Sequence, residues 1–235
     1  MAEIKNIKKA AERIKKAIEK KERIILYGDA DMDGVGSTII LEEAIKVLGG
    51  KITAIYFPDR EVEGYGLNED ALKFLKKYLP ALLILVDCGI SNLNEMKIAK
   101  KMGFEVIIVD HHKTLQKMPQ ASIIVDPKQK GDKYPFKEFA AAGVVFKLVE
   151  ELLAGKMTAS LKNNFLEIVA LATIADMMPQ TDDNSEIIKE GLRSLKNTSR
   201  PALQAFLELD PVIKDDVNQF VQKIILACNA SNGKN

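Results

Sequence analysis

Several short apolar runs in this 235-residue sequence end in acidic residues, and one of them also ends in the only two histidines of the chain. The residues that follow these runs are Asp29, Asp31 and Asp33 after 24–27, Asp87 after 81–86, and Asp110, His111 and His112 after 106–109. Carboxylates this close in sequence repel one another unless a cation lies among them. Oxygen ligands combined with an imidazole favour Mn²⁺ or Mg²⁺, and two such ions about 3.5–4 Å apart can activate water and clamp a phosphate. The pattern therefore predicts a two-metal site.

Each of these residues also has an interpretation without catalysis. The acidic triplet resembles the start of a calcium-binding loop, but Ile40 stands where such a loop places its glutamate. A solvated turn would also suit the triplet, a structural role would suit the histidine pair, and Asp87 is placed to cap a helix that begins near residue 92. Because all of them follow apolar runs, the metal site is favoured over these alternatives.

The apolar runs themselves predict a parallel sheet. They cover 24–27, 52–57, 81–86, 106–109 and 122–125, which are short, near-continuously apolar and in several cases β-branched, as in strands buried on both faces. Segments of helix length lie between them at 36–48, 68–78 and 92–102, and an amphipathic helix is predicted from Ile4 to Ile18. This alternation predicts an α/β fold with a doubly wound, five-stranded, mainly parallel sheet flanked by helices. Ligands bind beyond the carboxyl ends of such strands, where the acids and histidines would meet.

Beyond residue 138 the strand pattern gives way to helical patterns at 138–153, 161–175, 185–195 and 201–227. The sequence therefore predicts a helical C-terminal region. We divide the chain into an α/β core, residues 1–155, and a helical extension, residues 156–235, with a boundary near 155–160. We do not expect the extension to fold independently.

The composition is that of a soluble globular protein, with 47% hydrophobic and 29% charged residues. No apolar run reaches the roughly 20 residues that a membrane helix needs, and the charged start of the chain is neither a secretory signal nor an anchor. Cys88 and Cys228 are too few for a disulfide framework, which predicts reduced thiols and a cytoplasmic location. With 34 basic against 33 acidic residues, any contact with nucleic acid must come from a local patch.

One candidate patch follows the histidine pair. Six lysines and only two aspartates lie between residues 113 and 137. Such a segment could follow a phosphate backbone, in which case the affinity would fall steeply with added salt. Tyr134 and Phe136 lie among the lysines and could stack on bases. A lysine-rich loop that is merely solvated is the alternative.

Taken together, these motifs resemble the DHH phosphoesterase superfamily. The four motifs of that superfamily match, in order, Asp31 with Asp33, then Asp87, then the name-giving Asp110-His111-His112, and finally Asp176 after Thr173-Ile174-Ala175. The resemblance extends over roughly residues 22–191. Without it, Asp176 would be interpreted as a helix cap.

The resemblance implies a role for each site residue. The metal ligands would be Asp31, Asp33, Asp87, His111 and Asp176, which would hold two divalent cations, Mn²⁺ or Mg²⁺. His112 would contact the scissile phosphate, Asp110 would fix the histidine ring and its tautomer, and Asp29 would support the ligands or touch a metal-bound water. Arg60 and Lys113 would contact substrate phosphates, although Arg60 could also be an ordinary exposed loop arginine.

Within the superfamily the chain resembles the RecJ-type exonucleases. Four segments carry this resemblance: 27–29, 58–68, 140–147 and 228–234. It implies a metal-dependent exonuclease that degrades single-stranded DNA from the 5′ end, with a role in DNA repair and replication or repair proteins as partners. Enzymes of this type continue into a second domain that grips the strand, whereas this sequence stops at Asn235. The alternatives are a phosphodiesterase for short oligonucleotides or cyclic dinucleotides and a non-catalytic replication scaffold; the oligomeric state is left open.

Overall fold

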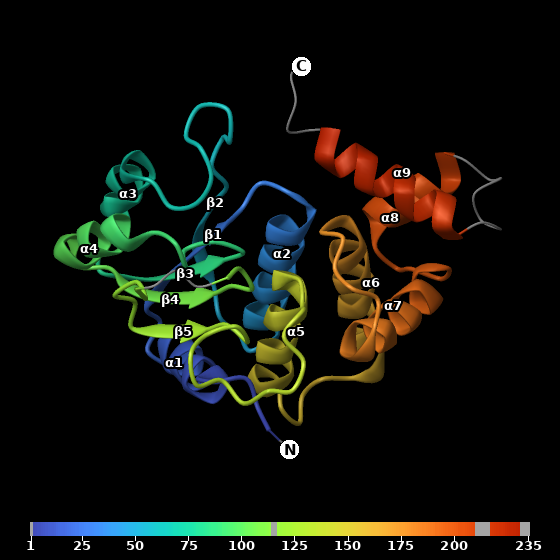
Figure 1. Ribbon diagram of the computed structural model, residues 1–235, viewed down its shortest axis with the longest axis horizontal. Coiled ribbons are helices and arrows are strands. Elements are labelled where there is room, and N and C mark those ends of the chain that lie inside the picture. Colours follow the sequence, from blue (N-terminus) through green and yellow to red (C-terminus); the bar gives the residue numbers. More distant parts are fainter. Residues whose placement is uncertain (1, 114–116, 210–216, 231–235) are drawn as a thin grey trace.

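The centre of the molecule is a five-stranded sheet in the order β2-β1-β3-β4-β5, and all neighbouring strands are parallel (Figure 1). The computed structural model describes residues 2–113, 117–209 and 217–230. The strands are β1 (Arg23–Gly28), β2 (Ile52–Tyr56), β3 (Ala81–Val86), β4 (Glu105–Val109) and β5 (Ile123–Val125). The predicted α/β fold with a five-stranded parallel sheet is confirmed.

The burial of each strand follows from its place in the sheet. Every residue of the central strand β3 is buried, as expected for an apolar strand covered on both faces. Along β2, half-buried and exposed residues alternate instead. Because β2 pairs only with β1 and lies at the edge of the sheet, the flanking helices cover it incompletely. The prediction that every apolar run is buried on both faces is therefore wrong for β2.

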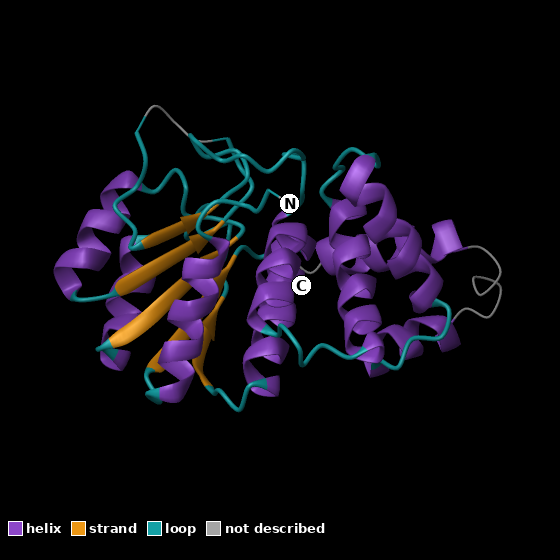
Figure 2. Ribbon diagram, turned by 90° about the horizontal axis from the view of Figure 1, so that it is seen from below, coloured by secondary structure: helices purple, strands orange, loops and turns teal. Residues whose placement is uncertain are grey.

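Helices cover both faces of the sheet (Figure 2). On one face, α1 (Ile7–Glu19), α2 (Met32–Val47) and α5 (Ala141–Leu152) share a hydrophobic core with the strands. On the other face, α3 (Glu69–Leu75) and α4 (Leu93–Met102) form a second core, and a short 3₁₀ helix, Lys76–Tyr78, continues α3. The sheet thus lies between two helix layers, and its strands β1, β3 and β4 lead at their carboxyl ends into Asp29, Asp87 and Asp110.

The C-terminal helices are α6 (Ala159–Ala175), α7 (Asp182–Leu195), α8 (Pro201–Leu209) and α9 (Val217–Ala230). They form a block beside α2 and α5, on the side away from the sheet (Figure 2). Phe165, Val169 and Ala172 of α6 belong to the same core as α2 and α5, so this helix is continuous with the α/β core. One helix was predicted over 201–227; α8 and α9 lie in this range, and residues 210–216 between them are outside the described residues. The division into residues 1–155 and 156–235 stays a prediction.

Two further expectations concern thiols and membranes. Cys88 is a buried free cysteine, as predicted, and the side chain of Cys228 lies outside the described residues. Residues 231–235, which hold most of the resemblance at the end of the chain, are also outside them. In the described part of the chain, no helix combines the length and the apolar character that crossing a bilayer requires.

The helix pair α6–α7 depends on a close backbone approach at Gly191. A Cβ atom at this position would overlap the carbonyl oxygen of Leu166 and the Cβ atom of Ala170. Only glycine lets α7 lie this near to α6, the helix whose C-cap is Asp176.

We expect Gly191→Val to lower the free energy of unfolding by about 2–3 kcal/mol, because the two helices must separate. Urea denaturation followed by circular dichroism measures this change. Lys189→Val places the same side chain at an exposed position of α7 and should cost much less. Equal midpoints for the two variants would contradict this account of the contact.

Candidate metal centre

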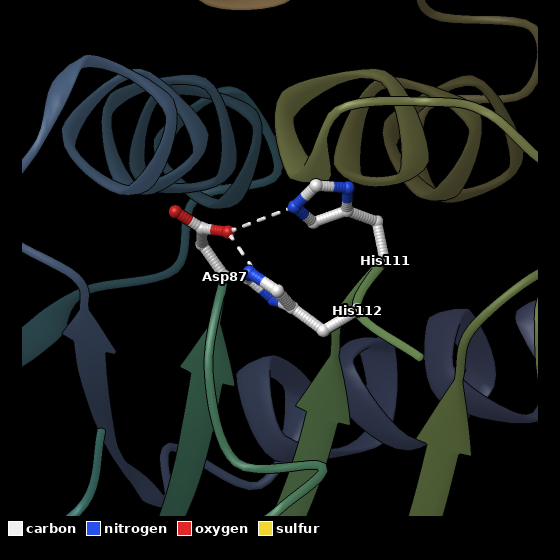
Figure 3. A group of neighbouring side chains, drawn as sticks. All are labelled: Asp87, His111 and His112. Carbon is white, nitrogen blue, oxygen red and sulfur yellow. Dashed lines mark ion pairs between the residues drawn. The ribbon is translucent and has the colours of Figure 1, made fainter. Parts of the chain in front are cut away.

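The carboxyl ends of β3 and β4 bring Asp87 and the histidine pair together. Figure 3 shows Asp87 at the end of β3 and both imidazole rings turned toward its carboxylate from the end of β4. Asp87 has a φ of 60°, in the left-handed region that aspartate tolerates better than most residues. Its N–H donates to the carbonyl oxygen of Val109 at 3.0 Å, which ties the two strand ends together. The backbone therefore holds Asp87 in a bent conformation over the sheet edge.

His111 faces three carboxylates. Its Nε2 atom lies 3.4 Å from Asp87 Oδ1, 3.6 Å from Asp176 Oδ2 and 3.8 Å from Asp33 Oδ2. The imidazole is buried, and among the described residues its Nε2 atom has no hydrogen-bond partner. The same holds for Asp87 Oδ1 and Asp176 Oδ2. Buried polar atoms without partners are costly, so this cluster needs something that is not protein to satisfy it.

Two helix N-termini position the acidic loop. Asp31 is the N-cap of α2, and its Oδ1 accepts hydrogen bonds from the N–H groups of Asp33 and Gly34, both at 3.0 Å. The carboxylate of Asp33 accepts from the N–H groups of Ala141 and Ala142, at 2.6 and 2.8 Å, in the first turn of α5. Because the N-cap of α5 is an alanine, Asp33 takes over the capping from another part of the chain. Both acids thus meet the positive ends of helix dipoles.

The cluster places several carboxylates close together, and their burial and mutual repulsion make each of them harder to ionise. Burial, and then the neighbouring Asp176 and Asp31, raise the pKa of Asp33, although its hydrogen bond from Ala142 works the other way. Burial and the charges of Asp33 and Asp31 raise the pKa of Asp87 well above its ordinary value. Burial also raises the pKa of Asp176. For His111, burial and the neighbouring His112 lower the pKa to about 4, so that near neutral pH the ring is uncharged and its lone pair is free to bind a cation.

The ligand atoms fit divalent cations. Three groups of side chains bring their ligand atoms within 4.8 Å of one another: Asp29, Asp31 and Asp87; Asp33, His111 and Asp176; and Asp87, His111 and His112. Ligands bound to one ion at about 2.1 Å lie about 3–4 Å apart, which matches the spacings around His111 Nε2. Asp87 belongs to two of the groups and lies where it could bridge two ions. The residues present therefore fit a pair of hard, oxygen-preferring cations such as Mn²⁺ or Mg²⁺.

The geometry also adds to the predicted ligand set. Asp31, Asp33, Asp87, His111 and Asp176 all lie in these groups, as do Asp29 and His112, for which other roles were predicted. The roles themselves stay predictions, but the chain brings all of the predicted ligands together.

Asp110 organises the second histidine. Its Oδ1 accepts from His112 Nδ1 at 2.8 Å and from the N–H groups of His111 and His112, while Oδ2 accepts from the N–H of Ile90 at 3.1 Å. Burial alone would raise the pKa of Asp110, but the hydrogen bonds and charge of His112 outweigh it and lower the pKa. The bond to Asp110 in turn raises the pKa of His112. The pair therefore favours an imidazolium that faces the site and is oriented by a carboxylate.

The two predicted phosphate contacts lie in different settings. Arg60 Nε donates to Asp29 Oδ1 at 2.9 Å, and Arg60 Nη2 contacts both Asp29 Oδ2 and, at 2.8 Å, Asp31 Oδ2. Arg60 is thus part of the acidic site as well as its rim, since its side chain is 38% exposed. Lys113 is exposed directly after His112, beside residues 114–116, which are outside the described residues.

Sequence reasoning missed Tyr65, which contacts the site, and the buried Asp126 at the end of β5. The Tyr65 hydroxyl donates to the carbonyl oxygen of Asp87 at 3.0 Å and lies 3.2 Å from His112 Nδ1. The sequence signal for Tyr65 was an aromatic residue between two glycines, Gly64 and Gly66. In the structure both glycines have a positive φ. Asp126 follows β5 just as the other acids follow their strands, and it is fully buried, with Oδ2 lacking a partner among the described residues. Asp126 could have been identified from the sequence, because it directly follows the fifth apolar run, residues 122–125.

The lysine-rich segment has fewer free groups than predicted. Lys128 pairs with Glu138 and Lys137 with Asp132. The Tyr134 hydroxyl donates to Asp183 Oδ2 at 2.7 Å, and the rings of Tyr134 and Phe136 both pack against Phe139 in the main core. Both rings are half-buried, so the stacking of these rings on bases stays a prediction.

Comparison with known proteins identifies the family. Residues 23–173 match the family model described as DHH family, N-terminal domain. The chain belongs to the DHH family. It is 43% identical over 207 residues to the single-stranded-DNA-specific exonuclease RecJ of Bacillus subtilis, and the matched region covers 88% of this chain and 26% of that protein. It is 32% identical over 208 residues to RecJ of Thermus thermophilus, which covers 87% of this chain and 30% of that protein.

The fold agrees with this DHH assignment. The chain matches the crystal structure of exonuclease RecJ bound to manganese with a TM-score of 0.79 and 26% identity, over 98% of this chain and 63% of that one. This DHH chain thus spans about a quarter to a third of the length of the two curated relatives.

Asp126 gives the stability of the fold a testable pH dependence. Burial raises the pKa of Asp126 from 3.8 to about 7, so the folded protein holds this proton more tightly than the unfolded chain. Ionising Asp126 therefore lowers stability progressively from about pH 4 to pH 7, and the full cost remains above pH 7.

We expect Asp126→Asn to remove this cost. In the presence of a chelator, the free energy of unfolding of the variant relative to the original chain should rise by on the order of 1–3 kcal/mol between pH 4.5 and pH 8. Thermal unfolding at both pH values measures it, with Asp70→Asn on the exposed face of α3 as the matched control. A difference that does not change with pH would refute the assigned cause.

Proposed function

We propose that this DHH chain carries the active centre of a two-metal phosphodiesterase that degrades single-stranded DNA from the 5′ end. The observation that carries the proposal is the neutral His111 Nε2 atom, which lies 3.4–3.8 Å from three carboxylate oxygens with no protein donor between them. Such an arrangement is stable when cations lie among the ligands.

The chain's own residues divide the remaining work. Divalent cations held by the aspartates and His111 would supply an activated water and neutralise charge on the phosphate. His112, oriented by Asp110 at 2.8 Å, is placed to donate a hydrogen bond to the scissile phosphate and to stabilise its developing negative charge. The Tyr65 hydroxyl touches both the Asp87 carbonyl and His112, which limits how far either can move. Arg60 lies at the rim, where a guanidinium can bind phosphate oxygens in a bidentate manner.

The relatives support the substrate and the metal. Two similar proteins carry the name single-stranded-DNA-specific exonuclease RecJ, and a similar solved structure is RecJ bound to manganese. We extend single-stranded DNA as substrate and Mn²⁺ as cofactor to this chain on that basis, and the same oxygen-rich ligand set also suits Mg²⁺.

A time course with 5′- and 3′-labelled single strands of DNA and RNA, with Mn²⁺ or with a chelator, tests the proposal. Release of mononucleotides from the 5′ end of DNA is expected only with the metal. Hydrolysis of dinucleotides or cyclic dinucleotides, without hydrolysis of long strands, would favour the small-substrate alternative.

We expect Asp87→Asn to lower hydrolysis by more than about 100-fold, since changes even to residues that only support metal ligands cost about 10–100-fold. Initial rates at saturating Mn²⁺ measure the effect. Asp70→Asn, an exposed aspartate of α3, should leave the rate unchanged. If Asp87→Asn retains full activity, or if the original chain has none, a scaffold role would replace the catalytic one.

We expect Lys113→Ala to weaken binding of single-stranded DNA and to reduce the slope of log affinity against log salt by about 0.7, the contribution of one phosphate contact to a single strand. Fluorescence anisotropy at several salt concentrations measures this slope. Lys101→Ala changes an exposed lysine near the end of α4, beside the amino end of β4, and should leave the slope intact. A slope that is the same in both variants would remove Lys113 from the DNA contact.

A further inference from the structure

The side chain of Arg60 binds the same carboxylates that form one of the three ligand groups. Its Nη2 atom contacts Asp29 Oδ2 and Asp31 Oδ2, and its Nε atom donates to Asp29 Oδ1. Asp29 and Asp31 join Asp87 in the group whose ligand atoms lie within 4.8 Å of one another. The guanidinium therefore lies where a divalent ion held by this group would need the same oxygens.

A guanidinium on these oxygens opposes such an ion in two ways. It occupies lone pairs of both carboxylates, and its positive charge repels a dication at short distance. The repulsion is weakly screened on the side of Asp29, whose side chain is only 1% exposed. In contrast, the side chain of Arg60 is 38% exposed, so it can turn outward without disturbing the core.

The loop that carries Arg60 is fixed independently of this side chain. Asp59 Oδ1 accepts hydrogen bonds from the N–H groups of Glu61 and Val62, and Glu63 Oε2 accepts from the N–H of Asp59 at 2.8 Å. Glu63 Oε1 also accepts from the Tyr56 hydroxyl at 2.6 Å, which anchors the loop to β2. Arg60 can thus change partners while its backbone stays in place.

We propose that Arg60 sets the metal affinity of the Asp29–Asp31–Asp87 group and couples it to phosphate binding. The guanidinium weakens ion binding while it contacts Asp29 and Asp31, and a phosphate that draws it away relieves this opposition. Phosphate then tightens the binding of the ion, and by linkage the ion tightens the binding of phosphate to the same extent. This inference rests on the proposed function for its phosphate ligand and its metal.

The test is isothermal titration of Mn²⁺ into the full chain, with and without thymidine 5′-monophosphate. For Arg60→Gln without nucleotide, we expect the Mn²⁺ affinity to rise by roughly threefold to tenfold. The reason is that the guanidinium no longer competes with the ion for the oxygens of Asp29 and Asp31. The nucleotide should tighten Mn²⁺ binding to the original chain, and it should do so less in Arg60→Gln. Arg60→Lys keeps the charge but loses the planar fork, and its affinity should fall between the two.

Two control variants separate contact from general charge. Lys128→Gln removes a cation near the site that contacts Glu138 and neither Asp29 nor Asp31, and it should change the Mn²⁺ affinity less than Arg60→Gln does. Arg193→Gln removes an exposed arginine of α7 and should change nothing. Circular dichroism confirms that each variant is folded.

The outcomes distinguish this inference from the proposed function. Weaker Mn²⁺ binding in Arg60→Gln would mean that Arg60 orders Asp29 for the ion. Equal binding would mean that Arg60 does not compete with the ion. Either result overturns the inference and leaves the proposed metal centre in place. Equal coupling to the nucleotide in the original chain and in Arg60→Gln would also overturn it. If the original chain binds no Mn²⁺, the proposed metal centre itself fails.

Discussion

The candidate metal centre depends on one constraint, the repulsion among carboxylates that the fold holds together away from water. Asp33, Asp87 and Asp176 all face one imidazole nitrogen at 3.4–3.8 Å, and two of the three are almost fully buried. Burial and mutual charge raise the pKa values of all three, so each is costly to ionise without a counter-charge. Divalent cations would convert this cost into binding energy, because the ligands are already assembled.

The fold tolerates these charges by directing hydrogen-bond donors at them. Asp31 and Asp33 receive the first N–H groups of α2 and α5, which are donors that no residue within their own helices can satisfy. Asp110 receives three main-chain N–H groups and the ring of His112, and it is the buried carboxylate whose pKa falls. The pKa values of Asp33 and Asp87 are raised instead. The protein itself therefore stabilises the charge of Asp110, whereas the charges of Asp33 and Asp87 remain available to a bound cation.

The helical extension belongs to the site as much as the sheet does. Asp176 comes from the end of α6, and Met32, which lies between Asp31 and Asp33, packs with Leu171 of α6 and with Val221 and Ile224 of α9. The first turn of α2 is therefore held between the sheet edge and the C-terminal helices. A displacement of α6 or α9 would move ligands that no strand fixes.

The sequence by itself determined that a parallel sheet forms, that strands alternate with helices along the chain, and that acids and histidines follow three of the strands. These features depend on the local alternation of apolar runs and helical segments, and on the rule that parallel strands end at one edge. Only the tertiary structure decided which side chains meet there. The partners of Arg60, the place of Tyr65 beside His112 and the bond from Tyr134 to Asp183 depend on contacts between residues far apart in the chain. Asp176 reached the prediction only through family resemblance, because an acid at the end of an apolar helix has no local signal that distinguishes a ligand from a cap.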